Sequence, residues 1–388
     1  MFKWARALIG ASIAALGLAG CGAGGPLPPA PNDAAASGRA QQAFVQALAP
    51  RRAGPPVVAV LALNEGTETT DLLLPHAVLQ RAGVAAQVVA PRRGPVALYP
   101  ALQIEAAQDF AGFDRAHPAG ADYVIVPAMQ PDDDPAVTAW LRRQAERGAR
   151  VIGICAGALV VGQAGLLDGR RFASHWYYRR QVADRHPSAR FVPHQRYVVD
   201  GDVATTTGIT ASVPAMLALV EALQGREKAQ AVAAEIGVAA WSPVHDSTAF
   251  GLNAGRATHY LLNKAAFWRH ERMQLPVHDG SDDIALALAA DAWSRTGRAS
   301  VQATAPGPVR LRSGLVLMAR PATEPLPSVP LAAAAKPVQQ LDRTLCEIAR
   351  RYGDARREWV MQEMEYPDPG AGCAGVTLHE PARRMSRS

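Results

Sequence analysis

One stretch near the middle of the chain predicts a strand, a sharp turn and a helix in immediate succession. Residues 151–154 are apolar or glycine and are typical of a buried strand, and an Ala-, Gly- and Val-rich segment with helical character follows. Cys155 stands at the turn between Gly153 and Gly157. This Gly-x-Cys-x-Gly pattern is the cysteine counterpart of the Gly-x-Ser-x-Gly nucleophile elbow. Because the glycines leave space for a tight turn, the stretch predicts a strand–turn–helix unit of an α/β fold.

The expected position of Cys155 favours a chemical role. A cysteine at the start of a helix lies near free N–H groups and the positive end of the helix dipole, which favour the thiolate. The alternative is structural, because a free cysteine also packs as a small hydrophobic residue in an apolar corner. The local pattern leaves both interpretations open.

Apolar runs and helical patterns alternate around this unit. Strands are predicted at 57–63, 84–90, 96–99 and 122–127, and helices at 71–82 and 135–148. The alternation predicts a flavodoxin-like parallel sheet with helices on both faces and the nucleophile elbow. Functional residues of such sheets collect at the carboxyl ends of the strands, where Cys155 is expected.

The first 20 residues have the features of an export signal. Lys3 and Arg6 precede an apolar run at 7–18 that is too short to span a membrane, and Leu-Ala-Gly then leads into Cys21. This segment resembles the bacterial lipoprotein signal. The resemblance implies a lipid on Cys21 and a location on the outer membrane facing the periplasm, because no Asp follows the cysteine. An ordinary secretory signal and an uncleaved anchor are the alternatives.

Composition narrows the remaining function classes. The segment 21–53 is rich in Gly, Pro and Ala and is interpreted as a flexible tether, with a helical piece near 40–49 as an option. Apolar content of 49% and charged content of 19% are typical of a globular chain. The net charge of +6, part of which lies in the signal, is too small to indicate nucleic-acid binding. We therefore expect no nucleic-acid partner.

Several motifs together resemble the ThiJ/PfpI superfamily of class I glutamine amidotransferase-like domains. The similar branches are the N-terminal domains of amidase-like transcription regulators and the isocyanide hydratases. The resemblance covers about residues 56–223, so a domain is predicted at 54–225. The motifs are 79–83, 125–127, 153–157, 164–170 with 174–176, and 197–211.

This resemblance implies a role for several residues. Cys155 matches the reactive cysteine, and Asp71 falls where the family places an acid close to the sulfur, as hydrogen-bond partner or general acid–base. Helix capping would equally explain Asp71. His175 matches a histidine that approaches the cysteine as a base or a water-orienting group, although a structural role is as common. Family members often dimerise, so a homodimer is one expected state.

The oxyanion site departs from the family pattern. The family has Gly-Gly after the strand at 122–127, whereas this chain has Ala128 and Met129. The backbone N–H groups of Met129 and Ala156 remain as expected oxyanion donors, but the Met side chain is expected to fill the pocket or restrict its own φ. No His follows Cys155 directly and no distant His-x-Glu pair is present, which disfavours a glutaminase triad. The sequence indicates neither a metal site nor another cofactor.

Residues 226–388 lie beyond the family resemblance and are expected to form a smaller α/β or mainly helical region. Helices are predicted at 227–236, 257–269 and 338–363. Residues 280–297 repeat the pattern of 66–83 at a separation of 214, with Ala285 at the position of Asp71. A degenerate partial copy of the first domain and chance similarity both explain this. Cys346 and Cys373 are expected to pair as a disulfide in an oxidising compartment, or to remain two thiols.

The leading interpretation is an exported, lipid-anchored protein whose cysteine site acts on a small electrophile. The family resemblance implies hydrolase, hydratase or lyase chemistry, with attack by Cys155 or by a water that Asp71 activates. The first alternative is a non-catalytic protein for binding or redox sensing. Transcription regulation is the second, but no helix-turn-helix pattern follows the first domain. The expected partners are a small molecule and, through Cys21, a membrane.

Overall fold

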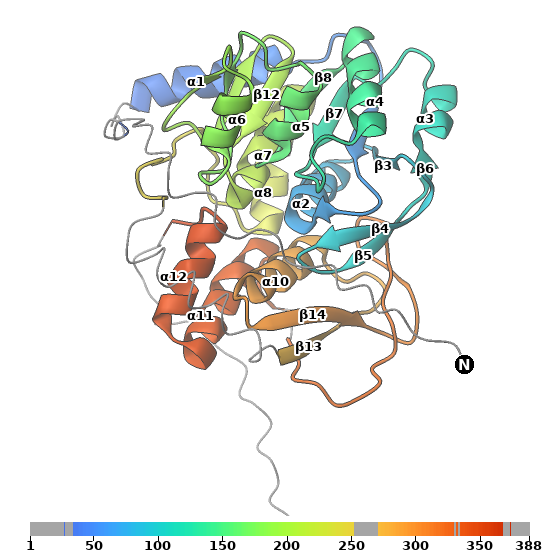
Figure 1. The fold of residues 1–388 in the computed structure, drawn as a ribbon, viewed down its shortest axis with the longest axis vertical. Helices are drawn as coiled ribbons and strands as arrows, with labels where there is room; N and C mark the ends of the chain where they lie inside the picture. The colour runs from blue at the N-terminus through green and yellow to red at the C-terminus, as the bar shows by residue number, and fades with distance from the viewer. Residues whose placement is uncertain are drawn as a thin grey trace, which may run out of the picture.

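The computed structural model describes residues 27, 34–251, 271–329, 331–332, 334–367 and 373. The signal, Cys21 and the helix expected at 257–269 lie outside the described residues. The first domain forms the upper part of the molecule in Figure 1 and the C-terminal elements form the lower part. None of the described helices combines the length and the apolar character that a membrane span requires.

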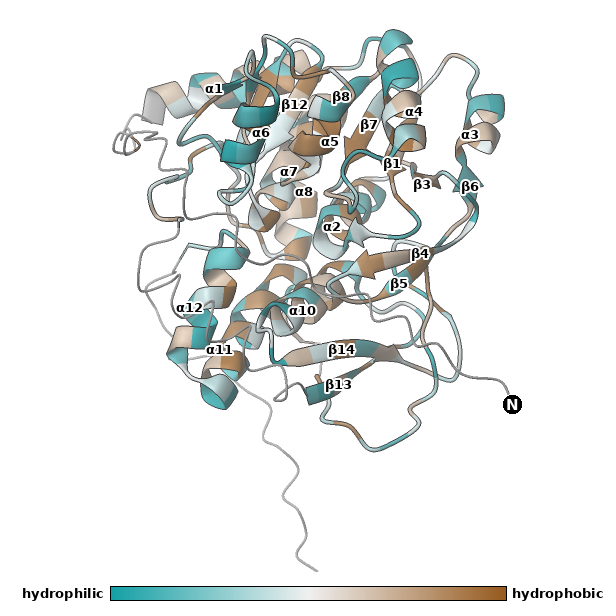
Figure 2. Cartoon of the chain, viewed as in Figure 1, coloured by the Kyte–Doolittle hydropathy of each residue, from teal (hydrophilic) through white to brown (hydrophobic). Residues whose placement is uncertain are grey.

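A seven-stranded sheet forms the centre of the first domain and confirms the predicted α/β fold. Its strand order is β11-β12-β8-β7-β1-β3-β6, and all neighbours are parallel except β11 and β12. The four central strands β1, β7, β8 and β12 are fully buried, as is typical of a parallel sheet covered on both faces. In Figure 2, β7 in the sheet has hydrophobic colours, whereas α6 at the surface has hydrophilic colours. The strands are β1 (Val58–Leu61), β3 (Ala86–Ala90), β6 (Gln108–Asp109), β7 (Tyr123–Val126), β8 (Arg150–Gly153), β11 (Tyr197–Asp200) and β12 (Val203–Thr206).

Two groups of helices flank this sheet. Helix α2 packs on α7, and α4 packs on α5, the helix that follows the elbow. Pro135 begins α4 and the Asp134 side chain caps it, as the sequence pattern indicates. The helices are α2 (Thr69–Arg81), α3 (Phe110–Ala116), α4 (Pro135–Glu146), α5 (Gly157–Gln163), α6 (Arg179–Arg185), α7 (Ser212–Gln224) and α8 (Arg226–Ile236), with a 3-10 turn η1 (Ile209–Ala211) and a small sheet of β9 (Arg171–Phe172) and β10 (Arg190–Phe191).

The second part of the predicted tether is helical, as the optional helical piece near 40–49 allowed, and the helix is longer than that piece. Residues Ala34–Ala47 form helix α1, which packs against α7 and β11. Phe44 and Leu48 are buried, and the Tyr123 hydroxyl donates to the Leu48 carbonyl over 2.7 Å. The apolar side chains of this segment pack on the domain. The folded part of the described chain therefore begins before residue 53.

The C-terminal region is mainly helical and shares a sheet with the first domain. In the five-stranded sheet β15-β16-β5-β4-β2, the first domain supplies β2 (Thr67–Glu68), β4 (Gly94–Tyr99) and β5 (Gln103–Ala106), and the C-terminal region supplies β15 (Val309–Arg310) and β16 (Val316–Leu317). The parallel pair β13 (Glu271–Pro276) and β14 (Ala299–Thr304) flanks α10 (Asp283–Arg295) in the chain. The other elements are η3 (Pro337–Gln339), α11 (Gln340–Tyr352) and α12 (Asp354–Glu363).

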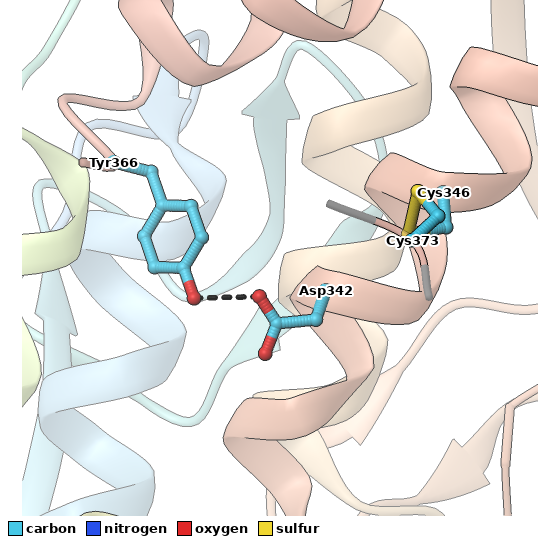
Figure 3. The surroundings of a disulfide bond; sticks show 4 residues. All are labelled: Asp342, Cys346, Tyr366 and Cys373. Carbon is cyan, nitrogen blue, oxygen red and sulfur yellow. Dashed lines mark hydrogen bonds between the residues drawn. A yellow bond between two sulfur atoms is a disulfide. The ribbon is translucent and has the colours of Figure 1, made fainter. Parts of the chain in front are cut away.

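The single helix predicted at 338–363 is two helices. Gly353 has φ 86° and ends α11, a left-handed conformation that glycine adopts without strain. Cys346 on α11 is joined to Cys373 by a disulfide with a Cα–Cα distance of 5.5 Å (Figure 3). Nearby, the Tyr366 hydroxyl donates to Asp342 on the same helix over 2.6 Å, so two links join Tyr366 and Cys373 to α11 (Figure 3).

Gly157 opens α5 where the helix passes the end of β7. A Cβ at this position would lie 2.1 Å from the carbonyl oxygen of Val126, a backbone atom that cannot move aside. Gly157→Ala is therefore expected to lower the free energy of unfolding by about 3 kcal/mol. Gly38→Ala is the control, because a Cβ on Gly38 in α1 meets nothing within 4 Å and should stabilise the helix. Urea denaturation compares the two variants, and equal stabilities would contradict the close approach.

Candidate active site

The elbow holds Cys155 at a positive φ, a backbone conformation that non-glycine residues rarely adopt. Strand β8 ends at Gly153, and Cys155 has φ 57°. Its N–H donates to the Thr206 hydroxyl over 3.1 Å, and its carbonyl accepts from the Ser174 hydroxyl over 3.2 Å. Strained non-glycine residues that are held by hydrogen bonds in this way are common at functional sites.

Cys155 borders a cavity of about 340 Å³ between the first domain and the C-terminal helices. Arg295 comes from α10, and Trp359 and Glu363 come from α12, so both halves of the chain form its walls. A larger hollow of about 500 Å³ lies elsewhere, beside His76 and Arg310; we place the site at Cys155 because its cavity combines a nucleophile with buried acids. The lining residues are Glu68, Tyr99, Ala128, Gln130, Cys155, Ala156, His175, Tyr177, Tyr178, Ile209, Arg295, Trp359 and Glu363.

Glu68 is a site residue that the sequence interpretation missed. Its carboxylate caps α2 by accepting from the Asp71 N–H over 2.6 Å and the Thr70 hydroxyl over 2.8 Å. The other oxygen accepts from the Arg295 guanidinium over 2.8 Å. Burial and the charge of Asp291 raise the pKa of Glu68 to about 7, against the opposing effect of Arg295. The available signal was an acid three residues before Asp71 at the start of a predicted helix.

Asp71 lies behind the cavity wall rather than in it. It is fully buried in the first turn of α2, and because Glu68 caps the helix, capping does not explain Asp71. One of its oxygens accepts from the Ala128 N–H over 3.2 Å, and the other has no hydrogen-bond partner among the described residues. Burial, and then the charge of Glu68, raise the pKa of Asp71 well above its usual range. The carboxyl is therefore suited to hold a proton beside the elbow.

The thiolate expected at the start of a helix is wrong for the resting protein. Burial raises the pKa of Cys155 well above its usual value, and the carboxylates of Asp71, Glu68 and Glu365 raise it further. Arg295 opposes them. The helix that follows is only seven residues long, so its dipole is weak against burial and three acids. Cys155 is consequently a neutral thiol until a nearby group accepts its proton.

His175 reaches the cavity, but both of its ring nitrogens are engaged with backbone. Nε2 lies 2.9 Å from the Glu363 carbonyl, and Nδ1 accepts from the Tyr177 N–H over 3.2 Å. This pattern assigns the proton to Nε2. Burial lowers the pKa of His175 to about 3, so the ring is neutral. A role as base stays a prediction, and the bonds favour a role in shaping the cavity.

The two expected oxyanion donors differ in their relation to the Cys155 cavity. Ala156 lines the cavity. Met129 pairs with Thr67 in a bridge whose hydrogen bonds run from the Glu68 N–H to the Ala128 carbonyl and from the Gln130 N–H to the Gly66 carbonyl. The Met129 N–H is not a donor of this pairing. Its side chain is buried and borders a neighbouring hollow rather than the Cys155 cavity, so it does not fill the site.

The fold and the elbow have counterparts in known proteins. Residues 57–222 match the sequence model of the DJ-1/PfpI family. These residues form a DJ-1/PfpI family domain. The match covers the seven-stranded sheet, the elbow and α7, and confirms the family resemblance for this part of the chain.

Curated relatives of the DJ-1/PfpI domain include an enzyme and a regulator. The isonitrile hydratase of Pseudomonas putida is 36% identical over 112 residues, which are 29% of this chain and 47% of that protein. The HTH-type transcriptional regulator CdhR of Pseudomonas aeruginosa is 33% identical over 112 residues, 29% of this chain and 33% of that protein. The match therefore spans less than half of either relative. A crystal structure of a ThiJ/PfpI family protein from Pseudomonas syringae aligns with a TM-score of 0.45 and 24% identity, covering 54% of this chain and 86% of that one.

Glu365 is a second acid that the sequence did not indicate. It follows α12 and has φ 49°, and its carboxylate accepts from the backbone N–H groups of Trp176, over 2.6 Å, and Gly208. Its carbonyl accepts from the Thr210 hydroxyl over 2.7 Å. These bonds fasten the end of α12 to two loops of the DJ-1/PfpI domain beside the cavity. No local pattern could reveal contacts between residues so distant in the chain.

Glu365→Ala is expected to destabilise the protein most at low pH. Burial raises the pKa of Glu365 from 4.5 to about 7. A carboxyl with a raised pKa in the folded state stabilises fully below its unfolded pKa, and this part is lost as the pH rises through about 7. The difference in unfolding free energy between the wild type and the variant should shrink by about 3 kcal/mol between pH 4 and pH 8. Urea denaturation at both values measures this, and a difference that grows with pH would contradict it.

Proposed function

We propose that this chain is an exported, lipid-anchored hydrolase, hydratase or lyase whose nucleophile Cys155 acts on a small electrophile. The observation that carries the proposal is a strained, buried thiol at the edge of a cavity with a proton-holding carboxyl, Asp71, behind it. Acids with raised pKa and a partnerless oxygen are costly in a folded protein and cluster at catalytic sites. The match to the DJ-1/PfpI family supports the same interpretation.

The chemistry follows from the resting protonation states. When a substrate carbon enters the cavity, the sulfur forms a bond to it and an electron pair of the attacked multiple bond moves away from the sulfur. The thiol proton passes by way of Asp71 to the substrate, to the heteroatom of a carbonyl compound, amide or nitrile or to the attacked carbon of an isonitrile, with the Ala156 N–H near the developing charge. With an amide, the amine first leaves with a proton. A water molecule then adds to the carbon, and the sulfur takes one of the water protons as the C–S bond breaks. A neutral thiol is suited to this series of steps, because it loses its proton at the moment when the sulfur attacks the carbon.

The cavity limits the substrate to small molecules. A volume of about 340 Å³ lies at the lower end of small-molecule sites. Tyr99 and Tyr178 supply aromatic walls, whereas Gln130 supplies an amide, so the walls suit a compact, partly apolar molecule. The similarity to an isonitrile hydratase makes isonitriles the first class to test, followed by small nitriles, carbonyl compounds and amides.

A turnover screen with covalent trapping tests the proposal. The full chain carrying Cys21→Ser is mixed with each compound class, and the reaction is quenched with acid. The protein is then digested, and the mass of the peptide that contains Cys155 is measured by mass spectrometry. We expect one class to give both product and a transient adduct on this peptide. Absence of product and adduct across all four classes would contradict the enzymatic function.

The export part of the proposal rests on sequence and on the disulfide. Cys346 and Cys373 are joined, and such bonds persist mainly in oxidising compartments such as the periplasm. In a bacterial host that processes lipoproteins, the wild type should partition into the detergent phase of a Triton X-114 extract and the Cys21→Ser variant into the aqueous phase. Equal partitioning of the two would contradict the lipid anchor.

A non-catalytic binding protein is the second candidate, and the raised pKa of Cys155 favours it over redox sensing. Sensor cysteines are oxidised as thiolates, which burial and three carboxylates disfavour here. A binding protein would give neither product nor adduct in the trapping experiment. The regulatory relatives do not add a third candidate, because the shared segment covers only part of their length.

A further inference from the structure

The elements after residue 270 repeat those of the first domain in the same order and at constant separations. Helices α2 (69–81) and α10 (283–295) have equal length and lie 214 residues apart. The parallel register agrees, because Val58 pairs with Ala86 in β1 and β3, and Arg272 pairs with Ser300 in β13 and β14 at the same separation. The hairpin β4–β5 likewise corresponds to β15–β16, and both hairpins are antiparallel.

A second block of the repeat follows at a separation of 128. The turn η1 and helix α7 correspond residue for residue to η3 and α11. Gly225 and Gly353 then join each helix to the next with nearly identical angles, φ 87° and ψ 165° against φ 86° and ψ 162°. Helices α8 and α12 follow directly. Agreement in element order, register and glycine geometry rules out chance similarity as the reason for the sequence repeat.

Between the two blocks the second copy is short. The first domain has residues 107–208 here, with β7, β8 and the elbow, whereas the second has only residues 320–336. The position equivalent to Asp71 is Ala285. The second copy therefore has no counterpart of Cys155 or of the acid behind it.

The two copies meet as two subunits of a symmetric dimer would. Helix α2 packs on its own equivalent α10, and β5 pairs with its own equivalent β16 through Ile104 and Leu317. Contacts between equivalent elements are the property of an isologous, two-fold interface. Both helices are buried over nearly their whole length, since one side faces their own strands and the other faces the equivalent helix.

Ion pairs across this interface are reciprocal. Arg81 ends α2 and contacts Asp282 of the other copy and Glu235 of its own. Arg295, at the equivalent position of α10, contacts Glu68 of the other copy and Glu363 of its own. Asp282 is the equivalent of Glu68, and Glu363 is the equivalent of Glu235. The same three-residue arrangement thus occurs twice, but only the pair of Arg295 and Glu68 borders a cavity with a cysteine.

From this we infer that residues 271–366 are a truncated second copy of the domain that serves as a built-in second subunit, and that its Arg295 positions Glu68 in the Cys155 site. The inference rests on the proposed function for its catalytic meaning, but not for its geometry. The arginine is held by three carboxylates, Glu68, Asp291 and Glu363. A chain with this internal partner has its α2 surface already covered, so we expect a monomer rather than the homodimer that the family resemblance implied.

Matched substitutions in the full chain carrying Cys21→Ser test the inference. Arg295→Met removes the cation that faces the cavity, and Arg81→Met removes its equivalent from the same interface. The readout is the pH dependence of Cys155 alkylation, which requires no turnover. The charged and titratable groups around the sulfur and its cavity are Asp71, Glu68, Glu363, Glu365, Arg295, Tyr99, Tyr177, Tyr178 and neutral His175.

We expect Arg295→Met to slow alkylation at pH 8 roughly tenfold, by moving the midpoint of the profile upward, while Arg295→Lys restores most of the rate. Arg81→Met should lower the melting temperature and leave the profile unchanged. Equal profiles for both Met variants would overturn the positioning role. Light scattering of the Cys21→Ser chain without an arginine substitution gives the mass independently of whether the arginine variants fold. A dimer mass would overturn the built-in subunit. If the alkylation profiles and the monomer mass are as expected but the turnover screen finds no product, only the proposed function is refuted.

Discussion

Cys155→Ser is expected to lower kcat at least about 10³-fold for the substrate class found by trapping, because a serine hydroxyl is a far weaker nucleophile than a thiol beside His175, whose ring nitrogens are both bonded to backbone. The substitution keeps the backbone bonds of the elbow to Thr206 and Ser174, so the fold should persist. Steady-state kinetics give the loss, and circular dichroism together with the melting temperature checks the fold.

The alternative route through water predicts a different outcome for the same variant. If Asp71 activates a water that attacks the substrate directly, the serine variant should retain at least a tenth of the wild-type rate and form no adduct. Such a result would contradict attack by sulfur while leaving an active cavity. A folded variant without activity supports covalent catalysis.

Asp71→Asn is expected to change turnover and thiol reactivity in opposite directions. Loss of the ionisable group should reduce kcat by about 10²- to 10⁴-fold, because the carboxyl that relays a proton from Cys155 to the substrate is then missing. The same change removes the carboxylate that raises the pKa of Cys155 most, so alkylation at pH 8 should become faster. A purely structural role for Asp71 predicts that both rates fall together with stability.

Asp283→Asn is the matched control for Asp71→Asn. Asp283 is also a fully buried acid in the first turn of a helix, with a pKa that burial raises, but it accepts from Ser313 and lies outside the cavity. Its replacement should reduce stability and leave kcat and the alkylation profile unchanged. A loss of turnover in this control would show that buried acids act on the site through general destabilisation.

The elements of the first domain could be predicted because each carries a strong local pattern. The continuous apolar runs of β1 and β7 permit little besides buried strands, and the two glycines around Cys155 indicate the turn. Helix α1 was missed as a docked element because it is Ala-rich and follows a Gly- and Pro-rich stretch that resembles a linker, although Phe44 anchors it. The break at Gly353 was missed because one glycine in a helical pattern is often tolerated.

The electrostatics of the site could not be predicted in the same way. The Arg295 contact to Glu68 joins residues 227 positions apart, and the contact of Glu365 to Trp176 joins residues 189 apart. Burial and these distant acids decide that Cys155 is a neutral thiol, against the local expectation of a thiolate. Local sequence determines where the sulfur lies, and the second half of the chain contributes to its charge.

The pH dependence of Cys155 alkylation, measured on the full chain carrying Cys21→Ser and compared with Asp71→Asn, tests the nature of this site most directly. Cys155 is the one cysteine outside the disulfide among the residues that the structure describes, so labelling can be assigned to it. We predict a midpoint above the ordinary thiol value of about 8.5, and a lower midpoint in the Asp71→Asn variant. A midpoint at or below the ordinary value that is the same in the Asp71→Asn variant would contradict a buried thiol whose pKa a neighbouring carboxyl controls.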